Sequence, residues 1–182
     1  MDAGGLVQRA CDSPDIVSAV QLAGSVNVLA AGKAAAAMLN AFTGSFSVPF
    51  PRVMGVSPAV PAVRPEGSEW FVGGHPLPDQ GSVAAATRAL AIAQDAPAEG
   101  LLVVLLSGGG SALMALPAES VSLRDKQETA QAQHITNDRP EHPSRIQKDA
   151  GPRPVKTNRC RRMILLFPVA LPFAFDMVAG FF

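Results

Sequence analysis

Continuous hydrophobic runs predict four strands in this chain. Val26–Ala31 reads VNVLAA, Leu101–Leu106 reads LLVVLL, and Arg52–Val56 and Glu69–Val72 are shorter candidates. Apolar runs without alternation are typical of strands that are covered on both faces of a parallel sheet. We therefore expect a parallel sheet with its longest buried strand at Leu101–Leu106.

Helical patterns alternate with these strands. The run AAAAML follows Gly32 and Lys33 and is a strong helix former. Val83–Gln94 carries apolar residues on one face, and Ser82 is expected to be its N-cap. Strand–loop–helix repeats with short connections predict an α/β fold, a Rossmann-like parallel sheet with helices on both faces.

Two further helices are predicted nearer the ends of this region. Pro14 suits the first turn of a helix that begins near Asp12 or Ser13. Ser122–Asp125 reads SLRD, which has the form of a capping box with Asp in place of Glu. Lys126–Gln133 is expected to continue that element as a helix.

The stretch Ser107–Ser111, SGGGS, directly follows the most apolar strand and precedes a short helix that Pro117 is expected to end. Such a turn leaves backbone N–H groups at a helix start, where they attract phosphate or carboxylate, and its serines can add hydroxyl donors. A tight structural turn without a ligand is the alternative. No lysine follows the glycines as in a Walker A loop, and Leu113 replaces the last glycine of a nucleophile elbow.

Two other positions suggest a binding role. Lys33 follows a second glycine turn, and a cation in the first turn of a helix is favourable if an anion is bound there; the alternative is a lysine that reaches into solvent. His75 and Asp79 lie in the rigid segment GGHPLPD directly after a strand. Open sheets bind ligands at the carboxyl ends of their strands, although a lone loop histidine is more often structural.

Charge divides the chain into two unlike parts. The 182 residues are 48% hydrophobic with a formal net charge of zero, but the distribution is uneven. Met1–Asp125 holds six basic and ten acidic residues, whereas Lys126–Phe182 holds nine basic and five acidic residues. Two distant cysteines argue against a disulfide framework or a metal site and fit a reducing cytoplasm.

Four segments, VNVLAAGKAAAAML, GGHPLPDQGS, LLVVLLSGGGSALM and VSLRDKQETAQ, follow one another between about Asp12 and Gln131. In order and spacing they resemble the class II glycerate kinases, the MOFRL-type glycerate 2-kinases. The resemblance implies an incomplete Rossmann-like N-terminal domain over residues 1–132. It also implies ATP-dependent phosphorylation of D-glycerate to 2-phosphoglycerate, with ATP and Mg²⁺ as cofactors; some relatives are named hydroxypyruvate reductases.

The same resemblance implies roles for individual residues. Lys33 matches the lysine of the family's Gly-Lys-Ala-Ala motif and is expected to be catalytic, because an ammonium offsets charge on the transferred phosphoryl group. The residues expected to bind substrate or phosphate are His75, Asp79, Ser107, Gly108, Gly109, Gly110 and Ser111. No metal-binding residue is expected. The expected partners are D-glycerate and a nucleotide in the cytoplasm, with neither nucleic acid nor membrane.

The resemblance ends near Ala132, and residues 133–182 are expected to be a largely disordered tail that lacks family sequence. Met163–Phe182 is apolar and long enough for a membrane span, but it contains two prolines and Asp176. We expect a frameshift or a mis-predicted gene end, with a tail anchor as the alternative. Without the family's second domain we expect little or no turnover, and binding of a small anion or nucleotide without turnover is the alternative function.

Overall fold

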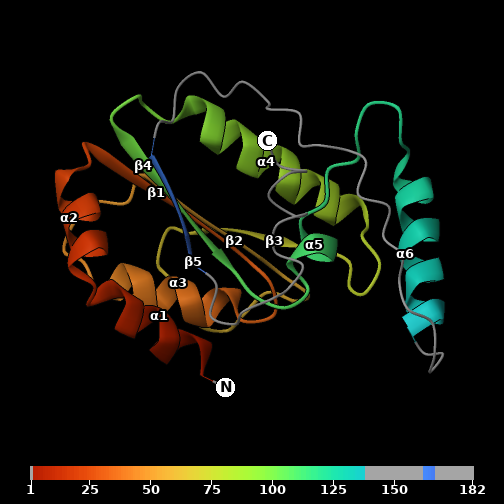
Figure 1. Ribbon diagram of the computed structural model, residues 1–182, viewed down its shortest axis with the longest axis horizontal. Coiled ribbons are helices and arrows are strands. Elements are labelled where there is room, and N and C mark those ends of the chain that lie inside the picture. The colour runs from red at the N-terminus through yellow and green to blue at the C-terminus, as the bar shows by residue number, and fades with distance from the viewer. Residues whose placement is uncertain (1, 138–161, 167–182) are drawn as a thin grey trace.

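The computed structural model describes residues 2–137 and 162–166 (Figure 1). The strands are β1 (Ser25–Ala31), β2 (Arg52–Ser57), β3 (Glu69–Val72), β4 (Gly100–Leu106) and β5 (Arg162–Leu166). The helices are α1 (Ala3–Cys11), α2 (Pro14–Leu22), α3 (Ala35–Gly44), α4 (Gln80–Asp95), α5 (Gly110–Leu113) and α6 (Leu123–Asn137).

All five strands form one parallel sheet in the order β3-β2-β1-β4-β5. The chain runs outward from β1 to β3 and then returns through α4 to place β4 on the other side of β1. This is the strand order of doubly wound folds, and the reversal between β1 and β4 is a topological switch point. Ligands of open α/β sheets bind in the crevice outside the strands at such a point.

The two faces of the sheet carry separate hydrophobic cores. Along β4, Leu101, Val103 and Leu105 pack in the core shared with α1 and α3, whereas Leu102 and Leu106 pack in the core shared with α4. Each of these side chains is at most 3% exposed. Figure 1 shows α1 and α3 on one side of the sheet and α4 on the other. The predicted α/β sheet with helices on both faces is confirmed.

The four strands predicted from hydrophobic runs are confirmed, each within a residue of its expected ends. The prediction for Pro14 is also confirmed, because α2 begins at this residue. A backbone N–H at the first helical position has no partner inside the helix, so the missing N–H of proline costs no hydrogen bond there. Helix α1 was not predicted separately. Its first turn contains Gly4 and Gly5, which are poor helix formers and interrupt the helical spacing of apolar residues.

Two predictions about helix ends beside the glycine turns are wrong. Lys33 does not lie in the first turn of α3, because Ala34 is the N-cap in a non-helical conformation and the helix begins at Ala35. Pro117 does not end α5. The backbone already leaves the helical region at Met114, and Leu113 is the last helical residue. Lys33 therefore belongs to the turn between β1 and α3.

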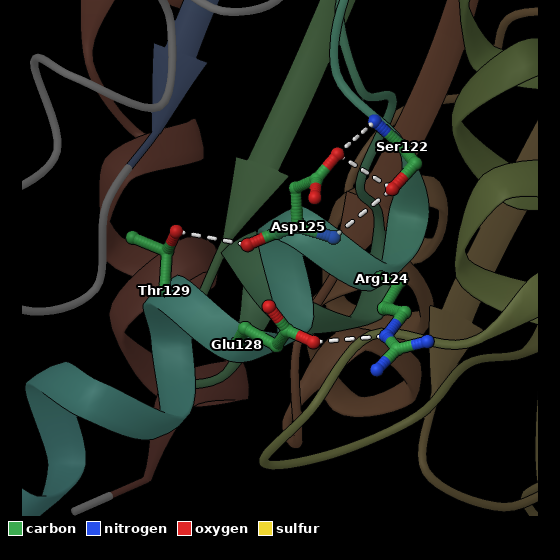
Figure 2. Close-up of polar contacts among 5 residues, drawn as sticks. All are labelled: Ser122, Arg124, Asp125, Glu128 and Thr129. Carbon is green, nitrogen blue, oxygen red and sulfur yellow. Dashed lines mark hydrogen bonds and ion pairs between the residues drawn. The ribbon is translucent and has the colours of Figure 1, made fainter.

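The capping box predicted at Ser122–Asp125 is confirmed (Figure 2). Asp125 Oδ2 accepts hydrogen bonds from Ser122 N at 2.9 Å and Ser122 Oγ at 2.6 Å, and Asp125 N donates to Ser122 Oγ at 3.1 Å. The hydrogen bonds from the side chain and backbone of Ser122 lower the pKa of the Asp125 carboxyl. Helix α6 then continues to Asn137, beyond the predicted end at Gln133.

Strand β5 is an element that the sequence pattern did not predict. Its backbone pairs in parallel with β4, with Arg162 opposite Leu101 and Leu166 opposite Leu105. The division at residue 132 remains a prediction, and the rest of the apolar segment Met163–Phe182, with its membrane and gene-end interpretations, lies outside the described residues. Among the helices that are described, none combines the length and apolar character needed to cross a membrane.

Candidate functional site

The turns that follow β1 and β4 contact each other at the topological switch point. Lys33 N donates a hydrogen bond to the Gly108 carbonyl at 3.0 Å, and Ala34 N donates to Ser107 Oγ at 3.1 Å. Ser107 N in turn donates to the Ala31 carbonyl at 2.9 Å. The structure therefore brings Lys33 and the SGGGS turn together at one edge of the sheet.

Gly32 makes this close approach of the two turns feasible. Its φ is +126°, a conformation that residues with a Cβ rarely adopt. A Cβ at this position would overlap the Ser107 hydroxyl and would lie 2.7 Å from the Ser107 carbonyl oxygen. The glycine is thus required both for the backbone conformation and for the packing of β4 against the β1–α3 turn.

The SGGGS turn presents unpaired backbone donors. The N–H groups of Gly108, Gly109 and Ser111 have no hydrogen-bond partner among the described residues, whereas Gly110 N donates to the Ser107 carbonyl at 3.2 Å. Gly108 and Ser111 are exposed, and a Cβ placed on Gly108 would meet no heavy atom within 4 Å. This combination of free donors and open space suits an anion that approaches the backbone closely.

The members of the turn are not equivalent. Ser107 is only 8% exposed, and its hydroxyl oxygen accepts the hydrogen bond from Ala34 N, so it helps to join the two turns. Gly110 is buried and opens α5. Gly108, Gly109 and Ser111 are therefore the members of the turn whose N–H groups are best suited to a ligand.

His75 extends the same site from the segment after β3. It is exposed, and a Cβ on Gly109 would lie 2.7 Å from His75 Cδ2 and 2.9 Å from His75 Nε2. Gly109 has φ +90°, so this position favours glycine for its backbone as well. The imidazole edge thus lies against the middle of the SGGGS turn, beside the free donors.

Lys33 supplies a cation at this edge. Its side chain is exposed, and it makes no ion pair with any residue that the structure describes. The Lys33 backbone is fixed by the hydrogen bond to Gly108, while the long side chain remains free to reach an anion. The same residue therefore combines a fixed main chain with an adaptable charge.

Asp79 is the N-cap of α4, so the prediction that Ser82 caps this helix is wrong. Asp79 Oδ1 accepts from Ser82 N at 2.9 Å and from Ser82 Oγ at 3.1 Å, and Asp79 N donates to Ser82 Oγ at 3.1 Å. Partial burial raises the pKa of Asp79, but hydrogen bonds from Ser82, Gly74 and Gly81 outweigh it and lower the pKa. The carboxylate thus serves the local fold, and a ligand contact by Asp79 stays a prediction.

Ser82 is the residue at this edge that sequence reasoning assigned to the wrong role. It stands at N3 of α4, and its side chain returns to the backbone of the N-cap. The signal is the order Asp-x-x-Ser, in which the acid comes first, whereas the usual capping box has the hydroxyl residue first. Reading that order would have placed the helix start at Gln80.

Residues 1–134 match the family described as "Domain of unknown function (DUF4147)". The chain belongs to this family. The match includes β1 to β4 and most of α6, and therefore every residue of the candidate site.

Relatives of this DUF4147 chain include named enzymes. A Pyrococcus horikoshii protein named glycerate 2-kinase is 48% identical over 52 residues, which are 29% of this chain and 12% of that protein. An Agrobacterium vitis protein, provisionally named a hydroxypyruvate reductase, is 38% identical over 110 residues, which are 58% of this chain and 24% of that protein. The predicted similarity to glycerate 2-kinases is confirmed.

A solved structure supports the same relationship. The crystal structure of glycerate kinase from Thermotoga maritima superposes with a TM-score of 0.58 and 27% sequence identity. The superposition covers 74% of this DUF4147 chain and 34% of the Thermotoga protein. The matched region is thus about a third or less of the length of each of these relatives.

Proposed function

We propose that this chain carries the phosphate-handling edge of a glycerate 2-kinase, which transfers the γ-phosphoryl group of ATP to the 2-hydroxyl of D-glycerate. The observation that supports it best is the junction of two glycine turns at the switch point, where Lys33 stands beside the N–H groups of Gly108 and Gly109, which have no partner among the described residues. The reaction itself is inferred from the similarity to glycerate 2-kinases. A cytoplasmic location and a nucleotide partner belong to the same proposal.

The chemistry of the site suits a phosphoryl group or a carboxylate. Backbone N–H groups in a glycine turn bind anionic oxygens without the steric hindrance of a Cβ. The Lys33 ammonium adds a charge-assisted hydrogen bond, which is about twice as strong as a neutral one. Ser111 can add a hydroxyl donor at the exposed end of the turn. Together these groups provide an anion site with both fixed and adaptable donors.

Phosphoryl transfer requires little covalent chemistry from the protein. The glycerate 2-hydroxyl oxygen forms the new bond to the γ-phosphorus and loses its proton to solvent, while the bond between that phosphorus and the bridging oxygen of ATP breaks and ADP leaves with that oxygen. Catalysis consists mainly of positioning the two groups and offsetting the charge on the transferred oxygens. We assign the second task to Lys33, and the backbone donors of Gly108, Gly109 and Ser111 would orient the anion.

The glycine pattern favours this function over a hydroxypyruvate reductase. A reductase of that kind would use a nicotinamide cofactor, which doubly wound folds commonly hold with the fingerprint G-x-G-x-x-G after the first strand. Here Gly32 is followed by Lys33 and four alanines, and Leu113 stands at the last glycine position after β4. Neither turn has the fingerprint, so the anion site accounts better for these residues.

The family resemblance implies Mg²⁺ together with ATP. Kinase sites hold Mg²⁺ through one or two carboxylates and the phosphates themselves. Within residues 2–137 and 162–166, no three His, Cys, Asp or Glu side chains gather where they could hold a metal ion. Asp79, the carboxylate nearest to His75 in sequence, is engaged in capping α4. We therefore assign no residue of this chain to the metal.

Isothermal titration calorimetry on the 182-residue chain tests the proposal. D-Glycerate, inorganic phosphate and ATP are titrated separately, and an assay for 2-phosphoglycerate with ATP and D-glycerate is run on the same preparation. We expect saturable binding of at least one anion, with little or no turnover. Absence of binding by all three ligands would refute the anion site, and binding of anions with NADH-dependent reduction of hydroxypyruvate would favour the reductase.

A further inference from the structure

Ser82 makes more hydrogen bonds than helix capping requires. Its side chain is fully buried, with 0% relative exposure. Its Oγ accepts from Gly74 N at 3.0 Å and from Asp79 N at 3.1 Å, and it donates to Asp79 Oδ1 at 3.1 Å. A hydroxyl has one donor and two acceptor positions, so these contacts use its whole capacity.

The bond to Gly74 is additional to the capping box. A capping box needs only the reciprocal contacts between the N-cap and N3 residues, here Asp79 and Ser82. The Gly74 bond instead ties the chain segment before His75 to the first turn of α4. Because Gly74 directly precedes His75, this contact limits where the imidazole can lie.

Ser82 also contacts the segment that follows the SGGGS turn. Its carbonyl oxygen accepts a hydrogen bond from Ala115 N at 3.2 Å, two residues after the end of α5. A Cβ on Gly73 would lie 3.0 Å from both Ser82 Oγ and Leu113 Cα, so the two segments pack closely at this point. Ser82 is thus joined to both segments whose residues meet at His75 and Gly109.

We propose that Ser82 is a positioning residue of the anion site. Its hydroxyl holds Gly74 so that the His75 imidazole stays against Gly109, beside the N–H groups of the SGGGS turn. This inference rests on the proposed function, because it concerns the same anion site. Ser82 itself is buried beneath the site and acts through His75 and its neighbouring backbone.

Substitution of Ser82 by Ala tests the inference. Loss of the hydroxyl leaves Gly74 N and Asp79 N without their partner and allows the segment that carries His75 to shift. We expect the affinity for inorganic phosphate to fall about three- to tenfold, the loss typical of one or two neutral hydrogen bonds. We also expect the NMR signals of the His75 ring to move in the absence of any ligand.

Ser122→Ala is the matched control. Ser122 belongs to a second Ser–Asp capping box, at the start of α6, where its hydrogen bonds are with Asp125 (Figure 2). If a weakened helix cap alone reduced binding, both variants would show it. We expect Ser122→Ala to bind phosphate like the parent chain and to leave the His75 signals unchanged.

The two readouts separate this inference from the proposed function. Weaker phosphate binding together with shifted His75 signals in Ser82→Ala supports the positioning role, and an unchanged affinity or unchanged His75 signals would overturn it. If the parent chain binds none of inorganic phosphate, D-glycerate and ATP, the proposed function fails, and the His75 signals alone decide whether Ser82 positions the ring. If Ser82→Ala does not fold, Ser82→Cys, which fills the space with a weaker acceptor, takes its place with the same expected directions.

Discussion

The backbone N–H of Ala34 donates a hydrogen bond to the hydroxyl oxygen of Ser107 across 73 residues of sequence. This single bond joins the turn after β1 to the turn after β4 at the point where the strand order reverses. Because both turns also exchange main-chain hydrogen bonds, the relative position of Lys33 and Gly108 is fixed by the backbone. The main chain therefore fixes the position of the candidate anion site, and the side chains add charge and further hydrogen-bond donors to it.

Gly32→Ala is predicted to be strongly destabilising. The φ of +126° at this position is unfavourable for a residue with a Cβ, and the added Cβ overlaps Ser107, so strain and overpacking act together. We expect the free energy of unfolding to fall by about 2–4 kcal/mol, measured by urea denaturation. Gly24→Ala is the control, because a Cβ there meets no atom within 4 Å, and it should change stability little. Equal stability of both variants would contradict the close packing at Gly32.

Lys33→Ala is predicted to weaken anion binding with little effect on stability. A charge-assisted hydrogen bond contributes about 1–3 kcal/mol, so we expect the dissociation constant for phosphate to rise roughly ten- to a hundredfold. The exposed side chain has no partner among the described residues to lose. Lys126→Ala, in α6, is the matched control for a general loss of positive charge, and calorimetry on the two variants should give different affinities. Similar affinities would remove Lys33 from the site.

Gly109→Ala is predicted to displace His75 and to reduce both stability and binding. The new Cβ would lie within 3 Å of two atoms of the imidazole, and the φ of +90° is unfavourable for alanine. We expect a loss of about 1–3 kcal/mol in the free energy of unfolding and moved His75 ring signals in the NMR spectrum. Unmoved His75 signals would show that the ring does not lie against Gly109 in solution.

The lowered pKa of Asp79 predicts how the fold responds to acid. A carboxyl whose pKa is lower in the folded than in the unfolded chain stabilises the fold above its ordinary pKa, about 3.9 for Asp. That contribution is lost as the pH falls through the lowered folded pKa. Asn is also a good N-cap, so Asp79→Asn should fold with the same cap but without this pH dependence.

Urea denaturation of the parent chain and Asp79→Asn between pH 2 and 6 measures this contribution. We expect the difference in unfolding free energy between the two proteins to be constant near pH 6 and to change in favour of the variant as the pH falls below about 4. A difference that does not vary over this range would mean that the hydrogen bonds to Asp79 do not form in solution.

The sheet could be predicted from sequence because its strands are continuous apolar runs. LLVVLL has no polar residue that could face water, so burial on both faces was the simplest interpretation. The convergence of Lys33 with Ser107–Ser111 also followed, since both turns come directly after parallel strands. Strand β5 was not predicted, because most of its residues belong to the apolar segment Met163–Phe182, which was interpreted as sequence from outside the family or as a tail anchor.

The details of the site depended on local geometry that residue patterns do not encode. One detail did have a sequence signal: the N-cap of α4 was assigned to Ser82, although the order Asp-x-x-Ser favours Asp79 as the residue outside the helix. The contact between His75 and Gly109 joins segments more than 30 residues apart and has no sequence signature. The buried position of Ser107 depends in the same way on the neighbouring turn.

Titration of the ¹⁵N-labelled chain with inorganic phosphate, followed by NMR, tests the anion site most directly. We predict saturable shifts that are largest for the backbone amides of Gly108, Gly109 and Ser111, with smaller shifts for Lys33 and His75. Lys33→Ala should require a higher phosphate concentration to reach the same shifts. Absence of saturable shifts, or the largest shifts on residues away from the switch point, such as those of α2, would contradict a phosphate site at this edge of the sheet.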